Sequence, residues 1–253
     1  AEPLAALAAR LFGDAHALDP GIPCATLAVR VAARLGGIAF EDDAEGRRAA
    51  WASVGVMCDE LSTPALVFNL PAQGDTPLGR LLRAARADGE PLHVSLRLGL
   101  RHSLAGDPAL VGRDIFVCEN PTIVALAVTQ LGPRCAPLVC VNGQFGAAAL
   151  VLLRQLRDAG ARLRYHGDFD PAGIGIARRA VEESGATPWR FAAEDYLAAP
   201  KGRPFTGDPG PTPWSPALAE AMRQTRRAAH EEAVFEALHH DLAEDGMPGD
   251  ALV

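Results

Sequence analysis

Lysine, tyrosine and long apolar runs are scarce in this sequence. Lys201 is the only lysine, so the positive charge comes almost entirely from arginine, whose guanidinium suits bidentate contacts to phosphate. No apolar run reaches the roughly 18 residues that a membrane-spanning helix needs. No charged and then apolar leader of the secretory type opens the chain, so we expect a cytoplasmic protein without a membrane segment.

Cys-x-x-Cys spacing and an excess of basic residues are missing as well. The cysteines are odd in number, and we predict that all of them are buried thiols in a reducing compartment: Cys24, Cys58, Cys118, Cys135 and Cys140. The formal net charge is −7. Because DNA-binding domains that act alone usually carry a basic face, this charge argues against a free-standing, high-affinity DNA binder.

Three polar loops are the most informative pattern that the sequence does contain. Each follows a short apolar run and precedes a segment with helical spacing: Cys118-Glu119-Asn120-Pro121, Val141-Asn142-Gly143-Gln144 and His166 to Gly173. Apolar runs of about five residues that alternate with helical patterns predict a parallel sheet with helices on its faces. The predicted pairs are Asp114–Cys118 with Pro121–Leu131, Pro137–Val141 with Gln144–Ala159, and Arg162–His166 with Ile174–Ser184.

The acidic residues of these loops should meet, because the carboxyl ends of parallel strands form one crevice. Prolines at positions 121 and 171 suit the first helical position, so Asn120 and Asp170 are predicted N-caps. Extended backbone from Asp168 to Asp170 would place both carboxylates on one side and Phe169 on the other. Because converging carboxylates are costly without a cation, Glu119, Asp168 and Asp170 predict a divalent metal site.

Two of these acids, considered one at a time, could have a purely structural role. Asp170 before a helix is often only a cap, and Asp168 could be a strand-end turn former. Two other enzyme classes fit the pattern less well. A dinucleotide fingerprint from Gly173 onward would need Gly or Ala where Arg178 stands. A haloacid dehalogenase-type phosphatase places its Asp-x-Asp on the first strand, not the third.

The order of Glu119 after one strand and Asp168-x-Asp170-x-x-Gly173 after another resembles the Toprim domain of topoisomerases, primases and related nucleases. The form Asp-Phe-Asp-Pro-Ala-Gly is most similar to the variant in the A subunit of topoisomerase VI. More narrowly, the chain resembles the Toprim nuclease subunit of Wadjet plasmid-defence systems (JetD/MksG-like). That likeness lies in residues 117–197 and in the strings Gly13 to Asp19, Tyr165 to Asp170, Pro188-Trp189-Arg190, Pro213-Trp214 and His230-Glu231-Glu232.

This resemblance implies a fold and an activity. The fold is α/β, a Toprim domain with a Rossmann-like parallel sheet and flanking helices, preceded by a smaller α+β region. Glu119, Asp168 and Asp170 would be the catalytic, metal-binding acids, with Mg²⁺ or Mn²⁺ as cofactor. The expected function is a DNA endonuclease that cleaves plasmids. Its expected partners are double-stranded DNA, an SMC-kleisin-type ATPase complex that delivers the DNA, and a second copy of the chain in a homodimer.

Hydrolysis is favoured over a covalent tyrosyl intermediate, because the chain has only Tyr165 on a strand and Tyr196 on a helix. Glu119 could act as a general base on the attacking water instead of as a ligand. Two rival functions stay open: a non-catalytic Toprim adaptor that docks an SMC complex or DNA, and a phosphomonoesterase.

Several residues beside the acids are candidates for substrate contact, each with an ordinary alternative. The Asn142-Gly143 amides could hold a phosphate or form a tight turn. His166 could touch DNA or be a satisfied strand histidine, and Arg178 could meet the DNA backbone or lie on a solvated helix face. Asn120 and Gly173 complete the set, since glycine lets a phosphate approach closely. Glu231 and Glu232 are predicted to face solvent, with a supplementary place in the metal shell as the alternative.

We predict three regions. Residues 1–110 form an α+β scaffold or partner-docking region, residues 111–199 the catalytic domain, and residues 200–253 a Pro/Gly-rich crossing segment and a C-terminal helix. Members of the resembled group have more sequence at the N-terminal end, so we expect a further part, a DNA-binding arm, before Ala1. The other predicted elements are helices at Leu4–Phe12, Cys24–Leu35, Arg47–Leu61 and Pro216–Leu242, and strands at Ala65–Leu70 and Leu92–Leu96.

Overall fold

The computed structural model describes residues 2–58, 61, 64–143 and 145–244. The chain divides into two compact units, residues 1–62 and residues 63–253. The predicted first region ran to residue 110, and in the structure residues 65–94 of that region add two strands to the sheet of the second unit. None of the described helices is long and apolar enough to cross a membrane.

The first unit is a small bundle of helices with a two-stranded parallel ribbon. Its elements are β1 (Glu2–Pro3), α1 (Leu4–Phe12), α2 (Pro23–Leu35), α3 (Ala44–Ser53) and β2 (Val56–Met57). Trp51 and Ala8 are buried at its centre, among the small residues of α2. The predicted extension of the third helix to Leu61 is wrong, because Gly55 takes a left-handed φ of 77° and the chain then pairs with β1. Cys24 is exposed and Cys58 is only partly buried, contrary to the prediction that all of the cysteines are buried.

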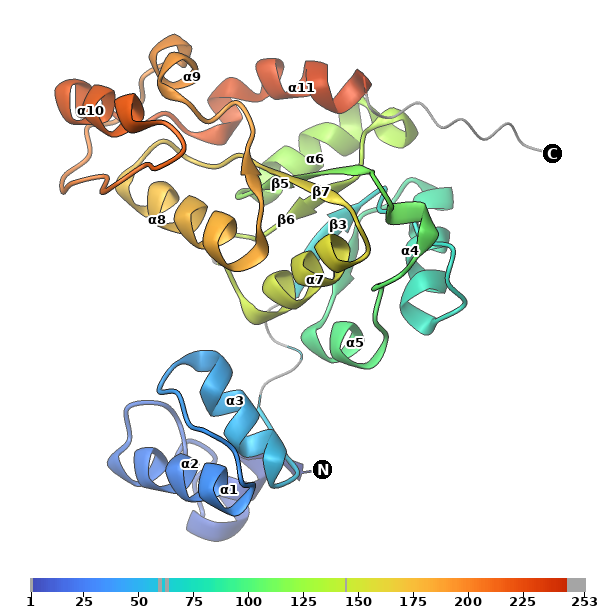
Figure 1. Cartoon of the computed structure of the whole chain (residues 1–253), viewed down its shortest axis with the longest axis vertical. Coiled ribbons are helices and arrows are strands. Elements are labelled where there is room, and N and C mark those ends of the chain that lie inside the picture. The colour runs from blue at the N-terminus through green and yellow to red at the C-terminus, as the bar shows by residue number, and fades with distance from the viewer. Residues whose placement is uncertain (1, 59–60, 62–63, 144, 245–253) are drawn as a thin grey trace. The chain divides into compact units, whose positions relative to one another are not determined.

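The second unit is a six-stranded mixed sheet with helices on both faces (Figure 1). The strand order is β4-β3-β6-β5-β7-β8. Strands β6, β5, β7 and β8 run parallel to one another. At one edge β3 pairs antiparallel with β6, and β4 pairs antiparallel with β3. The sheet strands are β3 (Ala65–Phe68), β4 (Leu92–Val94), β5 (Asp114–Cys118), β6 (Leu138–Cys140), β7 (Arg162–Tyr165) and β8 (Thr187–Pro188). This arrangement confirms the α/β class with a Rossmann-like sheet.

The helices of this unit alternate with the parallel strands, as predicted. They are α4 (Pro77–Asp88), α5 (Leu96–Arg101), η1 (Pro108–Leu110), α6 (Pro121–Gln130), η2 (Gly132–Arg134), α7 (Ala147–Asp158), α8 (Pro171–Arg179), η3 (Ala180–Ser184), α9 (Ala193–Ala198), α10 (Pro216–Thr225), η4 (Glu231–Val234) and α11 (Phe235–Glu244). Helix α7 starts three residues later than predicted, and Gln144 lies outside the described residues.

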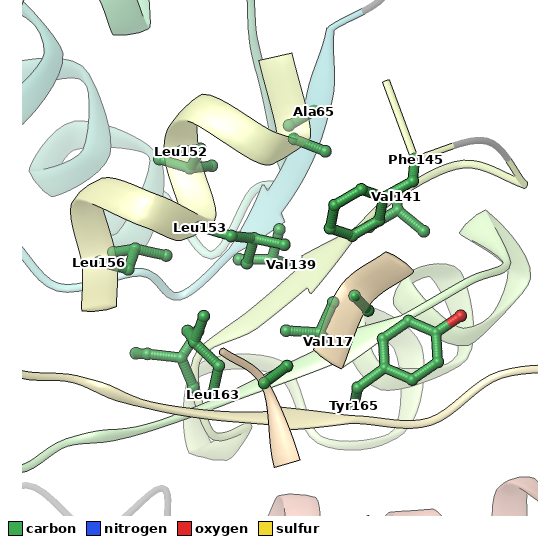
Figure 2. Packing of buried hydrophobic residues seen from close by; sticks show 14 of the residues in the cluster. Ala65, Val117, Val139, Val141, Phe145, Leu152, Leu153, Leu156, Leu163 and Tyr165 are labelled. Atoms are coloured by element: carbon green, nitrogen blue, oxygen red, sulfur yellow. The ribbon is translucent and has the colours of Figure 1, made fainter. Parts of the chain in front are cut away.

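Alternation along the strands produces two separate cores. Val117 of β5 lies in one core with Leu152, Leu153 and Leu156 of α7 (Figure 2). Ile115 of β5 belongs to the same core. The alternate residues of β5, Phe116 and Cys118, face α6 and α11. Side chains of successive strand residues point to opposite faces, so a strand covered on both sides is apolar throughout. The same pattern made these strands recognisable in the sequence.

The C-terminal region departs most from prediction. A single helix was expected over Pro216–Leu242, but α10 ends at Thr225 because Arg226 adopts a left-handed φ of 50°. Residues 227–229 are then extended and form isolated bridges with Pro204 and Phe169. The expectation of one helix was wrong because the sequence from 217 to 245 holds no glycine or proline to mark the break. The predicted crossing segment before Pro216 is irregular, and Trp214 anchors it by stacking on Phe191.

We predict that Leu153→Ala lowers the free energy of unfolding by roughly 3 kcal/mol, because the leucine is fully buried between α7 and the sheet. Urea denaturation monitored by circular dichroism measures the change. The exposed Leu197 is the matched control, and Leu197→Ala should change stability by less than about 0.5 kcal/mol. Equal effects of the two substitutions would contradict the assignment of the core.

Candidate metal centre

The predicted acidic residues follow adjacent parallel strands. Glu119 comes directly after β5, and Asp168 and Asp170 follow β7, its parallel neighbour. The prolines act as predicted: Asn120 caps α6 by accepting the amide of Thr122, 2.9 Å away, and Asp170 caps α8 by accepting the amide of Gly173, 2.8 Å away. Both acids of the third loop are half-buried, whereas Phe169 is only 1% exposed. Phe169 therefore lies in the core, as predicted for extended backbone.

Asp168 and Asp170 are brought together with His230. Each offers one ligand atom, and within the described part of the chain these three atoms lie within 4.8 Å of one another. His230 Nδ1 lies 3.0 Å from Asp168 Oδ2, and this contact raises the pKa of His230. His230 is not among the site residues predicted from the sequence. It belongs to a segment distant in sequence, and a lone histidine before two glutamates carries no ligand spacing of its own.

Glu119 lies next to this group but is not a member of it. Its side chain is 9% exposed, and its Oε2 accepts a hydrogen bond from the Asp168 amide at 3.3 Å. Burial, together with the negative charges of Asp168 and Asp170, raises the pKa of Glu119 to about 7. Glu119 therefore lies where the negative charges of neighbouring carboxylates converge.

Small and unpartnered groups next to Glu119 also suit a bound cation. A Cβ atom on Gly167 would lie 2.9 Å from Glu119 Oε2 and 2.7 Å from the Tyr165 hydroxyl, so a larger residue there would displace one of these side chains. The Tyr165 hydroxyl is buried without a hydrogen-bond partner in the described structure. Hard oxygen donors, excess negative charge and an unsatisfied hydroxyl fit a divalent cation. Asp168 and Asp170 would hold it, with Glu119 adjacent.

Glu231 connects the two acidic loops, contrary to the prediction that it faces solvent. Its side chain is fully buried, and its carboxylate accepts the amides of Glu119 at 3.0 and 3.1 Å and of Asn120 at 2.7 Å. Its own amide donates to Asp168 Oδ1 at 2.8 Å. Burial holds the pKa of Glu231 well above its usual range. Glu232 is exposed, as predicted, and accepts the side-chain amide of Asn120 at 2.5 Å.

The remaining candidates for substrate contact make ordinary structural contacts. Asn142 and Gly143 form an exposed turn with positive φ, and their amides already donate to Cys140 Sγ and to the Glu119 carbonyl. A Cβ on Gly173 would lie 2.2 Å from the Asp168 carbonyl oxygen, so this glycine lets α8 pack against the acidic loop. Arg178 is half-buried near Gly210 instead of lying on a solvated face. A role in substrate contact stays a prediction for all of them.

His166 is a buried strand-end histidine. Its side chain is 1% exposed among Phe169, Trp189 and Phe191, and its Nδ1 lies 3.0 Å from the Trp189 carbonyl oxygen. Burial lowers the pKa of His166 to about 4. The ring is therefore neutral at physiological pH, and Nδ1 is the donor to the carbonyl.

The pKa of His166 predicts a pH dependence of stability. Between pH 6.5 and pH 4 the unfolded chain binds a proton on this ring and the folded chain does not, so stability falls as the pH falls. Below pH 4 the shifted pKa of His166 lowers the free energy of unfolding by roughly 3 kcal/mol relative to neutral pH. Unfolding free energies at pH 7 and pH 5 should therefore differ more for the wild type than for His166→Gln. The same pH dependence in both proteins would contradict the assignment.

We predict that Glu231→Ala destabilises the protein by about 2 to 4 kcal/mol, since it leaves buried amides of the β5 loop without an acceptor. The neighbouring Glu232→Ala is the matched control and should cost less than about 1 kcal/mol, because that carboxylate is exposed. Chemical denaturation gives both values. Coincident denaturation curves for the two variants would show that the buried carboxylate does not connect the loops.

Comparison with known proteins identifies the family. Residues 92–242 match the family model described as "Protein of unknown function C-terminus (DUF2399)", and residues 1–72 match "Protein of unknown function N-terminus (DUF3323)". A search of curated proteins found no match. The first model spans more than half of the sequence and contains every acid of the candidate metal centre. The chain therefore belongs to the DUF2399 family.

Proposed function

We propose that the chain is a metal-dependent DNA endonuclease of the Toprim type that acts as the cleaving subunit of an SMC-type anti-plasmid complex. One observation carries the proposal: Glu119, Asp168 and Asp170 gather at the carboxyl edge of adjacent parallel strands, where the negative charges of both aspartates help to raise the pKa of Glu119. Acidic groups in this arrangement are typical of phosphoryl-transfer sites that use Mg²⁺ or Mn²⁺.

The roles of the residues follow from their positions. Asp168 and Asp170 would bind the ion, which, when bound, polarises the scissile phosphate and activates water. Glu119 accepts a hydrogen bond from the Asp168 amide, and in this proposal its carboxylate would take the proton of the attacking water. Glu231 fixes the backbone of Glu119 and the carboxylate of Asp168, so it positions both acids.

The tyrosines support hydrolysis over a covalent tyrosyl intermediate. Tyr165 and Tyr196 are both fully buried, and the Tyr196 hydroxyl donates to the Arg227 carbonyl oxygen at 2.6 Å. A nucleophilic tyrosine has to reach the DNA backbone, which neither side chain can do from its place in the core. Water is therefore the proposed nucleophile.

Family and charge support the biological setting. The DUF2399 family is that of JetD/MksG-type domains, in agreement with the resemblance to the nuclease subunit of Wadjet systems. A net charge of −7 favours delivery of DNA by a partner over independent capture. An SMC-kleisin-type ATPase complex is the proposed partner, plasmid DNA the proposed substrate and the cytoplasm the proposed location.

We predict that the purified protein nicks or linearises supercoiled plasmid with Mg²⁺ or Mn²⁺, alone or with its SMC partner, and that EDTA stops the reaction. Glu119→Gln and Asp168→Ala should each lower the rate by at least about 100-fold, since they remove the proposed base and a metal ligand. Asp158→Asn is the matched control, because Asp158 is exposed and ends α7, away from the site. Gel electrophoresis resolves the plasmid forms.

The rival functions give different results in the same assay. An adaptor would leave plasmid intact in wild type and variants alike, even with the partner complex present. A phosphomonoesterase would hydrolyse a small phosphate ester and leave closed circles uncut. Either result would refute the endonuclease.

A further inference from the structure

His230 is held beside the acids by backbone pairing. Phe169 and Ala229 exchange hydrogen bonds of 2.9 and 3.3 Å in an antiparallel bridge, which places residue 230 opposite residue 168. Directly opposite residues of antiparallel segments point to the same side. The His230 ring and the Asp168 carboxylate are therefore neighbours by register, and the Glu231 amide fixes the second oxygen of that carboxylate.

The distances suit shared coordination of one ion. Nδ1 of His230 and Oδ2 of Asp168 are 3.0 Å apart, and an oxygen of Asp170 completes a group within 4.8 Å. Two adjacent ligand atoms that each lie roughly 2.1 Å from an octahedral ion are about 3 Å apart. The His230 side chain is 48% exposed, so a hydrated ion can reach it from solvent.

A simple ion pair between His230 and Asp168 would leave negative charge at the site without a counter-charge. One imidazolium could offset one carboxylate, whereas a second carboxylate, that of Asp170, lies in the same group within 4.8 Å. The buried Tyr165 hydroxyl next to Glu119 is a second, independent sign of an absent ligand, because it has no partner in the described structure. Both observations favour an ion over an ion pair.

We propose that His230 supplies a nitrogen ligand beside Asp168 and Asp170, so that the centre prefers a first-row transition ion such as Mn²⁺ over Mg²⁺. The inference rests on the metal site of the proposed function and specifies its cofactor class. Mg²⁺ prefers oxygen ligands, whereas imidazole is a good ligand for first-row transition ions. A mixed oxygen and nitrogen set therefore discriminates against Mg²⁺.

The test is metal binding by the full chain, freed of metal with a chelator. Calorimetry should give a Kd for Mn²⁺ at least about tenfold lower than for Mg²⁺. His230→Ala should weaken Mn²⁺ binding by about tenfold or more and Mg²⁺ binding by less than about threefold. His93→Ala is the matched control, because His93 is an exposed histidine on β4. It should bind both ions as the wild type does.

Pulsed electron paramagnetic resonance of bound Mn²⁺ tests nitrogen coordination directly. Wild type and His93→Ala should show nitrogen-14 coupling, and His230→Ala should not. Absence of the coupling in the wild type, or equal loss of Mn²⁺ and Mg²⁺ affinity in His230→Ala, would overturn the proposal. Nitrogen-coordinated Mn²⁺ without plasmid cleavage would refute the endonuclease but not this ligand. Plasmid cleavage with Mg²⁺ or Mn²⁺, without nitrogen coupling, would refute His230 as a ligand but not the endonuclease.

Discussion

The acidic edge of the sheet depends on hydrogen bonds made by one short segment, residues 227–231. Ala229 pairs with Phe169, and the carboxylate of Glu231 accepts the amides that follow β5. Like charges that converge at a sheet edge repel one another, so their positions need support from neutral donors. Backbone amides provide that support on both loops. The same segment carries His230, and the proposed metal centre is therefore built by three parts of the chain.

The sheet and the helix caps were predictable because their signals are local. A strand buried on both faces is apolar throughout, and prolines at positions 121 and 171 mark the first turns of α6 and α8. Parallel order then requires Glu119 and Asp168 to end at the same edge. Those three inferences locate the acidic edge without any knowledge of side-chain contacts.

The rest of the site could not be predicted because it arises from long-range contacts. Glu231 bonds to residues more than 100 positions earlier, and no local pattern marks a glutamate as buried. Arg226 breaks the expected helix without a glycine or proline, and its strained φ is compensated by the bridges of residues 227–229. The antiparallel strands β3 and β4 were expected as strands, but their place in the main sheet depends on pairing across more than 60 residues.

The central claim is that Asp168 and Asp170 share a divalent cation. Anomalous diffraction from crystals soaked in Mn²⁺ tests it most directly, because the signal identifies and locates the ion. The account predicts a peak about 2.2 Å from an oxygen of each carboxylate. A peak elsewhere, or none at a Mn²⁺ concentration that supports plasmid cleavage, would contradict it.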